Sequence, residues 1–87
     1  MACEGKCEGT ATKPFRMYPH EHRIPGLMDL IKNVEGLARE DATKKCRKQG
    51  GQNCFCKGEA KIVFLIGEGG ELYIRADFRG NCHERQG

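Results

Sequence analysis

The feature that most constrains the fold is a pair of apolar segments near the C-terminus, separated by a glycine-rich turn. Residues 60–66 read AKIVFLI, residues 67–70 read GEGG, and residues 71–78 read ELYIRADF. Two runs of strand-forming residues around such a turn are typical of a β-hairpin. We therefore expect this part of the chain to form two antiparallel strands.

The spacing of the apolar residues also predicts the register of the hairpin. If Ile66 faces Leu72, the same alignment continues along both strands and brings Cys56 opposite Cys82. The pairs between these two are Phe64–Ile74, Ile62–Ala76, Ala60–Phe78 and Gly58–Gly80. Side chains alternate between the two faces of a strand, so all of these residues share one face, which we take as the core face. A shift by one residue would turn the apolar side chains of one strand to solvent.

A long helix is predicted before the hairpin. From residue 27 the apolar residues follow a helical period and form one stripe: Leu27, Leu30, Ile31, Val34, Leu37 and Ala38. The helix is expected to end at Gly50 and Gly51, because glycine readily adopts the left-handed conformation of a helix end. Asp41 and Lys45 fall in line with the apolar stripe, so a kink or break within residues 36–40 is the competing expectation.

The first strand is expected from about Cys7 to Tyr18, followed by a loop that reaches Gly26. Pro14 favours an edge position for this strand, because proline cannot donate a ladder hydrogen bond. The predicted fold class is therefore α+β: a single βαββ domain over residues 1–87, with a three-stranded sheet and one long helix packed on one face. A helix that packs back on the sheet makes the first two strands parallel if they share that sheet.

This topology brings all six cysteines to one pole of the domain. They are Cys3 and Cys7 at the start of the first strand, Cys46 near the helix end, Cys54 and Cys56 at the start of the second strand, and Cys82 at the end of the third. A chain this short has a thin core, so cross-links are expected to stabilise it. Cys56 and Cys82 form the candidate disulfide, because opposed strand residues lie within the span that a disulfide needs.

Zinc is the alternative cofactor at the same pole. Thiolates suit a tetrahedral structural zinc ion, and four of Cys3, Cys7, Cys54, Cys56 and Cys82 could hold one. The spacings Cys-x3-Cys and Cys-x-Cys differ, however, from the paired Cys-x2-Cys knuckles of common zinc sites. A redox-active pair of thiols is a third interpretation, although the two-residue spacer of thioredoxin-type motifs is absent.

The outer face of the sheet carries the predicted binding surface. Its residues are Arg16, Tyr18, Val63, Leu65, Tyr73, Arg75 and Arg79. Val63 and Leu65 should be covered, because a sheet with a helix on one side normally turns polar residues outward on the other. The expected cover is a second copy of the same sheet, giving a homodimer, or another protein partner. Single-stranded nucleic acid is the alternative, with the tyrosines stacking on bases and the arginines contacting phosphate.

A basic cluster, KKCRK at residues 44–48, admits two interpretations. Cations in the last helical turns complement the negative end of the helix dipole. Alternatively, they form a patch that contacts phosphate. The net charge of the chain is only +3, well below that of a dedicated nucleic-acid-binding domain.

The motifs of the common enzyme classes are missing. The chain contains no serine, no HExxH and no glycine-rich phosphate loop after a strand. No window approaches the ~20 apolar residues of a membrane span, so no membrane partner is expected. The N-terminal MACEGKCEGT lacks an apolar signal-peptide core, which favours a cytoplasmic location. We therefore expect a small non-catalytic binding or regulatory module acting on a macromolecular partner; the alternative is a zinc-stabilised nucleic-acid-binding domain.

Overall fold

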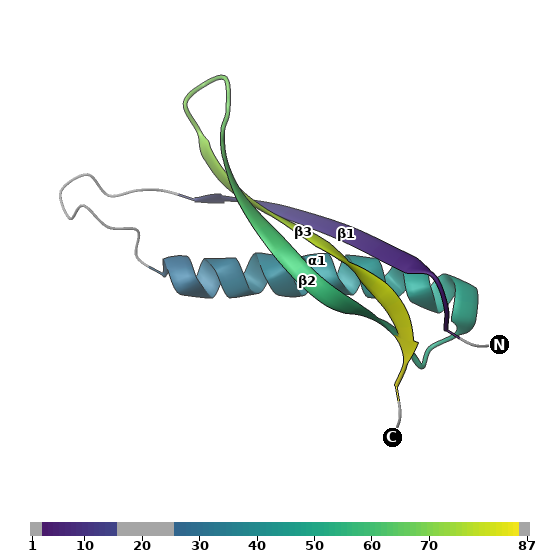
Figure 1. Cartoon of the computed structure of the whole chain (residues 1–87). Helices are drawn as coiled ribbons and strands as arrows, with labels where there is room; N and C mark the ends of the chain where they lie inside the picture. The colour runs from purple at the N-terminus through teal and green to yellow at the C-terminus, as the bar shows by residue number, and fades with distance from the viewer. Residues whose placement is uncertain (1–2, 16–25, 86–87) are drawn as a thin grey trace.

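The protein folds as a three-stranded sheet with one helix across it (Figure 1). The computed structural model describes residues 3–15 and 26–85. Its elements are β1 (Lys6–Phe15), α1 (Leu27–Gly50), β2 (Cys54–Ile66) and β3 (Leu72–Glu84). This arrangement confirms the predicted α+β fold. The end of the predicted first strand beyond Phe15, and the following loop up to residue 25, lie outside the described residues.

The hairpin of β2 and β3 has the predicted register. Ile66 faces Leu72 and Cys56 faces Cys82, with every expected pair between them in place. Both strands extend beyond the predicted segments, to Cys54 and Glu84. The register continues without a bulge, so the alternation of side chains between the two faces is unbroken along the whole hairpin.

β1 lies at one edge of the sheet, next to β3. Because β1 and β2 are both antiparallel to β3, they run in the same direction, as predicted, although they are not neighbours. The N–H of Thr10 points away from β3, toward Asp41 of the helix. Backbone groups alternate in direction along a strand, so the nitrogen of Pro14 points the same way. The proline therefore removes no hydrogen bond from the ladder.

α1 is one continuous helix, so the alternative of a break within residues 36–40 is wrong. It ends as expected, with Gly51 at φ 101° and its N–H donating to the carbonyl of Arg47 at 3.0 Å. Asp41 and Lys45 face the edge of β1. Asp41 accepts the N–H of Thr10 at 3.1 Å, and the Lys45 ammonium donates to the carbonyl oxygen of Glu8 at 2.8 Å. These two polar residues lie in the apolar stripe because their side chains form hydrogen bonds with backbone groups at the free edge of β1.

The core lies between the helix and the sheet and is built from small side chains. Val34, Ala38, Ala42, Ile74 and Ala76 are fully buried. Phe78 and all the cysteines other than Cys3 are buried with them. Few large apolar side chains contribute, which fits the thin core expected of a chain of this length.

The far half of the hairpin twists away from the helix (Figure 1). Phe64 and Ile66 point to the same face as the core residues, yet they are 54% and 78% exposed. Phe64 retains one aromatic contact, with the ring of Phe15 at 5.8 Å in an edge-on arrangement. The prediction that the whole face is core is therefore wrong for these two residues, because the hairpin twists away from the helix before it reaches them.

Candidate functional site

Three disulfides hold the pole where the cysteines converge. They join Cys3 to Cys54, Cys7 to Cys56 and Cys46 to Cys82, with Cα–Cα distances of 5.6, 5.9 and 5.6 Å. No cysteine is free. The predicted convergence of all six cysteines is thereby confirmed, and so is their role as cross-links.

The predicted bridge between Cys56 and Cys82 is wrong. These residues face each other across the hairpin, but Cys56 bonds to Cys7 of β1 and Cys82 bonds to Cys46 of α1. The facing positions showed only that a bridge between these two residues could form, and Cys7 and Cys46 also lie within bonding reach of them. These two disulfides connect β2 to β1 and β3 to α1.

The Cys7–Cys56 bridge crosses over β3. Strands separated by a third strand lie about 9.5 Å apart in a flat sheet, whereas these two Cα atoms are 5.9 Å apart. The sheet is therefore strongly curled at this pole. Gly80 and Gly58 face each other at the curl, and a Cβ on either would overlap the backbone of the opposite strand. Only glycine allows so close an approach.

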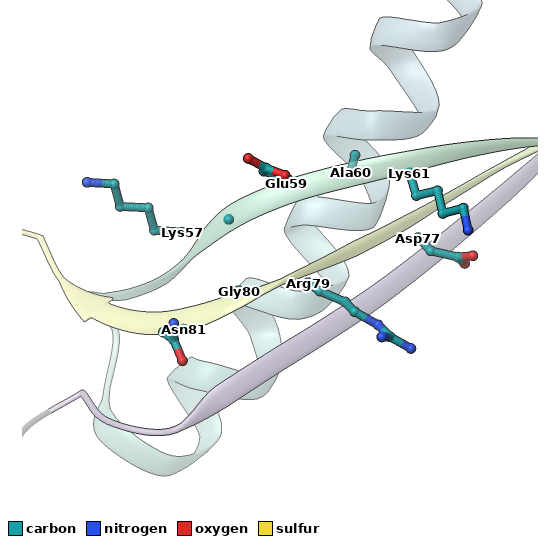
Figure 2. Close-up of a pocket in the computed structure, with 9 residues that line it drawn as sticks. Lys57, Glu59, Ala60, Lys61, Asp77, Arg79, Gly80 and Asn81 are labelled. Carbon is teal, nitrogen blue, oxygen red and sulfur yellow. The ribbon is translucent and has the colours of Figure 1, made fainter.

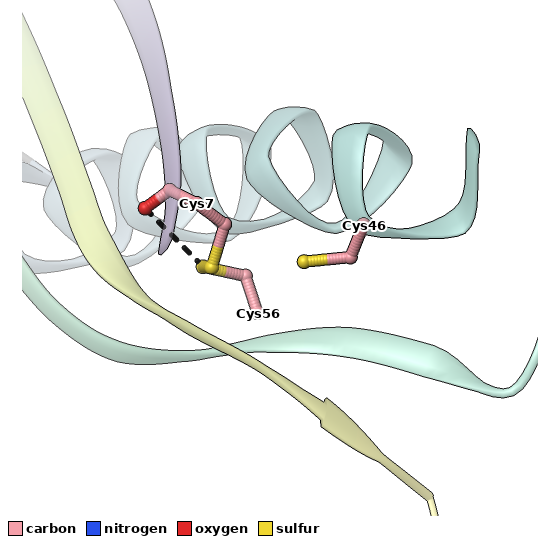
Figure 3. Close-up of side chains that lie close together, drawn as sticks. All are labelled: Cys7, Cys46 and Cys56. Carbon is pink, nitrogen blue, oxygen red and sulfur yellow. Dashed lines mark hydrogen bonds between the residues drawn. A yellow bond between two sulfur atoms is a disulfide. The ribbon is translucent and has the colours of Figure 1, made fainter. Parts of the chain in front are cut away.

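The sulfurs of Cys7, Cys46 and Cys56 lie within 4.8 Å of one another (Figure 3). This proximity resembles a metal site, but each sulfur belongs to a disulfide and cannot act as a thiolate ligand. The Cys56 sulfur also contacts the Cys7 carbonyl oxygen at 3.6 Å. This is a contact without a hydrogen bond, since a bridged sulfur carries no proton. The oxidised cysteines therefore do not fit the zinc site considered above.

The outer face of the sheet carries the predicted binding residues that the structure describes. Val63, Leu65 and Tyr73 are half-buried there. A terminal guanidinium nitrogen of Arg75 lies 3.2 Å from a carboxylate oxygen of Asp77. Nε of Arg79 lies 3.5 Å from a carboxylate oxygen of Glu8, so both cations have acidic partners. Arg16 and Tyr18 lie outside the described residues.

A groove of about 510 Å³ opens on the outer face beside the paired glycines (Figure 2). Its polar lining consists of Lys57, Glu59, Lys61, Asp77, Arg79 and Asn81. The charges are mixed in sign, and the lining contains no histidine, cysteine or hydroxyl. The lining therefore contains neither a serine–histidine nor a cysteine–histidine pair.

The free edge of β2 is a feature that the sequence analysis missed. Near the cysteines this edge is satisfied by the helix, since Arg47 donates to the Cys54 carbonyl at 3.3 Å and the Cys56 N–H donates to Thr43 at 3.2 Å. Alternation then turns the backbone groups of every second residue beyond Cys56 away from β3. Four residues have outward-pointing N–H and C=O groups with no hydrogen-bond partner within residues 3–15 and 26–85: Gly58, Ala60, Ile62 and Phe64.

Along the described ranges, no helix is long and apolar enough to cross a membrane. No protein-family model matches the chain, and no curated protein or solved structure is significantly similar to it.

Proposed function

We propose that this protein is a small non-catalytic binding module that acts on a protein partner through the far half of its hairpin. The observation that carries this proposal is the open edge of β2, which presents unpaired N–H and C=O groups from Gly58 to Phe64. Phe64 and Ile66 lie exposed beside it. An open strand edge next to apolar side chains is a template for pairing with another strand.

The partner that fits this edge is a second copy of the chain. A two-fold axis at Ile62 would pair two β2 strands antiparallel, and homodimers of this symmetry are the commonest oligomers. Phe64 would then lie opposite Ala60 of the second copy, and Ile66 opposite Gly58. The large exposed side chains thus meet small residues, and the edge groups of both copies form hydrogen bonds.

The side chains that would face each other favour a two-fold axis at Ile62 over one at Lys61 or Ala60. An axis at Lys61 would place two lysines directly opposite each other, which is destabilising. An axis at Ala60 would place Phe64 of the second copy against Cys56, whose N–H is already bound by Thr43. An axis at Ile62 also covers part of the outer face. Val63 then lies opposite Lys61 of the second copy and Leu65 opposite its Glu59, and the alkyl stems of those side chains partly cover the two apolar residues.

The substitution Ala60→Pro tests this proposal. The backbone nitrogen of residue 60 points away from β3. Proline there removes an N–H group from the free edge of β2 while leaving the hydrogen bonds between β2 and β3 intact. Ala60→Ser is the matched control, because it keeps the N–H and nearly the same size. Sedimentation should give a dimer for the wild type and for Ala60→Ser, and a folded monomer for Ala60→Pro. A wild type that sediments as a monomer at high concentration would refute pairing through this edge.

The zinc-stabilised nucleic-acid-binding alternative has less support. The sulfurs that would bind zinc are bridged, and the outer-face cations Arg75 and Arg79 have acidic partners. Base stacking on this face would also have to rely on Tyr73 alone among the described residues named for it.

A further inference from the structure

A second groove, of about 480 Å³, lies between the helix and the start of β2. Its lining combines four cations, one acid, one threonine and one aromatic ring: Arg39, Lys44, Arg47, Arg85, Glu40, Thr43 and Phe55. We call this the basic groove. Segments far apart in sequence build it, since its residues come from the helix, from the start of β2 and from the end of the described chain.

Three of the four cations are held in place by contacts with the fold. Arg47 donates through Nε to the Cys54 carbonyl at 3.3 Å, which leaves its terminal nitrogens available. The Arg39 guanidinium lies 5.4 Å from the centre of the Phe78 ring. Arg85 lies 6.0 Å from the centre of the Phe55 ring, and its backbone N–H donates to the Asn53 carbonyl at 2.7 Å. Ordered cations lose less freedom when a ligand binds.

The four cations of the basic groove outnumber its one acidic residue, Glu40. Within the described part of the chain, the ion pairs engage Lys45, Arg75 and Arg79, and none engages a cation of the basic groove. The groove therefore carries an excess of positive charge that no acidic group in an ion pair neutralises. Complementing the helix dipole does not account for Arg39 or Arg85, which lie outside the last helical turn.

We propose that the basic groove binds sulfated polysaccharide, with the guanidinium groups and Lys44 contacting sulfate oxygens. Arginine presents a fork of donors that matches tetrahedral oxyanions, and short basic runs such as KKCRK recur in heparin-binding patches. The lining includes none of residues 58–66, the part of β2 proposed to pair in the dimer, so the inference goes beyond that dimer and does not depend on it.

Two observations favour a sulfated glycan over nucleic acid. Binding to single strands relies on several aromatic rings in succession, whereas the basic groove contains one ring, beside which Arg85 already lies. The protein is also cross-linked by three disulfides. Such bridges persist in oxidising surroundings, where sulfated glycans are the characteristic polyanions.

The test is a calorimetric titration of the disulfide-bonded full chain with a heparin-derived hexasaccharide. Lys44→Gln removes an exposed cation of the groove, and Lys32→Gln is the matched control, an exposed lysine in the first half of the same helix. We expect Lys44→Gln to weaken binding roughly three- to fivefold, as loss of one exposed charge contact does, and Lys32→Gln to leave it unchanged. Arg47→Lys, which keeps the charge but loses the fork, should also weaken binding.

Two further titrations separate sulfate recognition from general attraction to anions. The same hexasaccharide stripped of its sulfates should fail to bind, and a single-stranded oligonucleotide of equal charge should bind more weakly than the sulfated sugar. Equal losses in Lys44→Gln and Lys32→Gln, or tighter binding of the oligonucleotide, would overturn the proposal.

Discussion

At the scale of single residues, the closest contact between helix and sheet depends on one glycine. A Cβ at Gly9 of β1 would overlap the carbonyl oxygen of Ala38 and the nitrogen of Ala42. Ala38 and Ala42 are themselves fully buried. The backbones of strand and helix therefore touch with no side chain between them, which explains why the stripe of the helix is narrow and built from alanine at this point.

This contact predicts that Gly9→Ala destabilises the protein. The added methyl group cannot fit without moving the helix away from β1, and overpacking of this kind costs about 1–3 kcal/mol. Urea denaturation of the disulfide-bonded protein should show a lower midpoint with an unchanged slope.

Gly36→Ala is the control for the same chemical change. Gly36 lies inside the helix, and beyond the helix's own backbone a Cβ there would meet no atom of the described residues within 4 Å. Replacing glycine by alanine inside a helix should stabilise it by about 0.5–1 kcal/mol. Opposite signs for the two substitutions would establish the close contact at Gly9, whereas a neutral Gly9→Ala would show that helix and strand are farther apart than in this structure.

At the scale of elements, the hairpin could be predicted from sequence and the disulfide pairing could not. Alternation fixes which residues of two strands can face each other, so the pairing of Ile66 with Leu72 determines all other pairs. The bridge from Cys7 to Cys56 depends instead on how sharply the sheet curls at Gly58 and Gly80. No periodic pattern encodes that curl, although two glycines facing each other were a visible sign of it.

The competing prediction of a break in the helix was wrong for a related reason. Asp41 and Lys45 look like defects in an apolar stripe, because the stripe indicates only burial and not hydrogen bonds to a strand edge. In the structure both side chains satisfy backbone groups of β1, and they also lie 3.9 Å apart as an ion pair of adjacent helical turns. The free edge of β2 was missed because its existence depends on strand order, which the sequence leaves open.

The helix-to-edge contact predicts that Asp41→Ala exposes the edge of β1. Loss of the carboxylate leaves the Thr10 N–H without its acceptor, so its amide hydrogen should exchange faster while amides of the β2–β3 ladder keep their protection. The cost in stability should be about 1 kcal/mol, as for one hydrogen bond to a charged group near the surface. Hydrogen exchange followed by NMR measures both effects.

Glu40→Ala is the matched control on the neighbouring position. Glu40 is exposed and forms no hydrogen bond or ion pair with another described residue. Its removal should leave exchange at Thr10 unchanged. If both substitutions accelerate exchange equally, the effect reflects general loosening of the helix and not the contact from Asp41.

At the scale of the whole molecule, three bridges join the N-terminal segment and all four elements at one pole. They close loops with sequence separations of 51, 49 and 36 residues. Loop-closure entropy alone gives about 4 kcal/mol for loops of this length, and measured values are typically about 2–4 kcal/mol for each bridge. The total stability of a small domain is only about 5–15 kcal/mol. The bridges therefore account for a large share of the stability of a core that contains few large side chains.

We therefore expect reduction to unfold the protein. Intact mass should first show the oxidised chain lighter than the reduced one by two hydrogens for each of the three bridges. Reductant should then abolish the cooperative thermal transition seen by circular dichroism. The double substitution Cys3→Ser with Cys54→Ser is the control, because it removes only the bridge to the segment before β1 and should lower the stability while leaving a cooperative transition. A reduced protein that still unfolds cooperatively near the oxidised midpoint would show that packing between helix and sheet, and not the bridges, stabilises the fold.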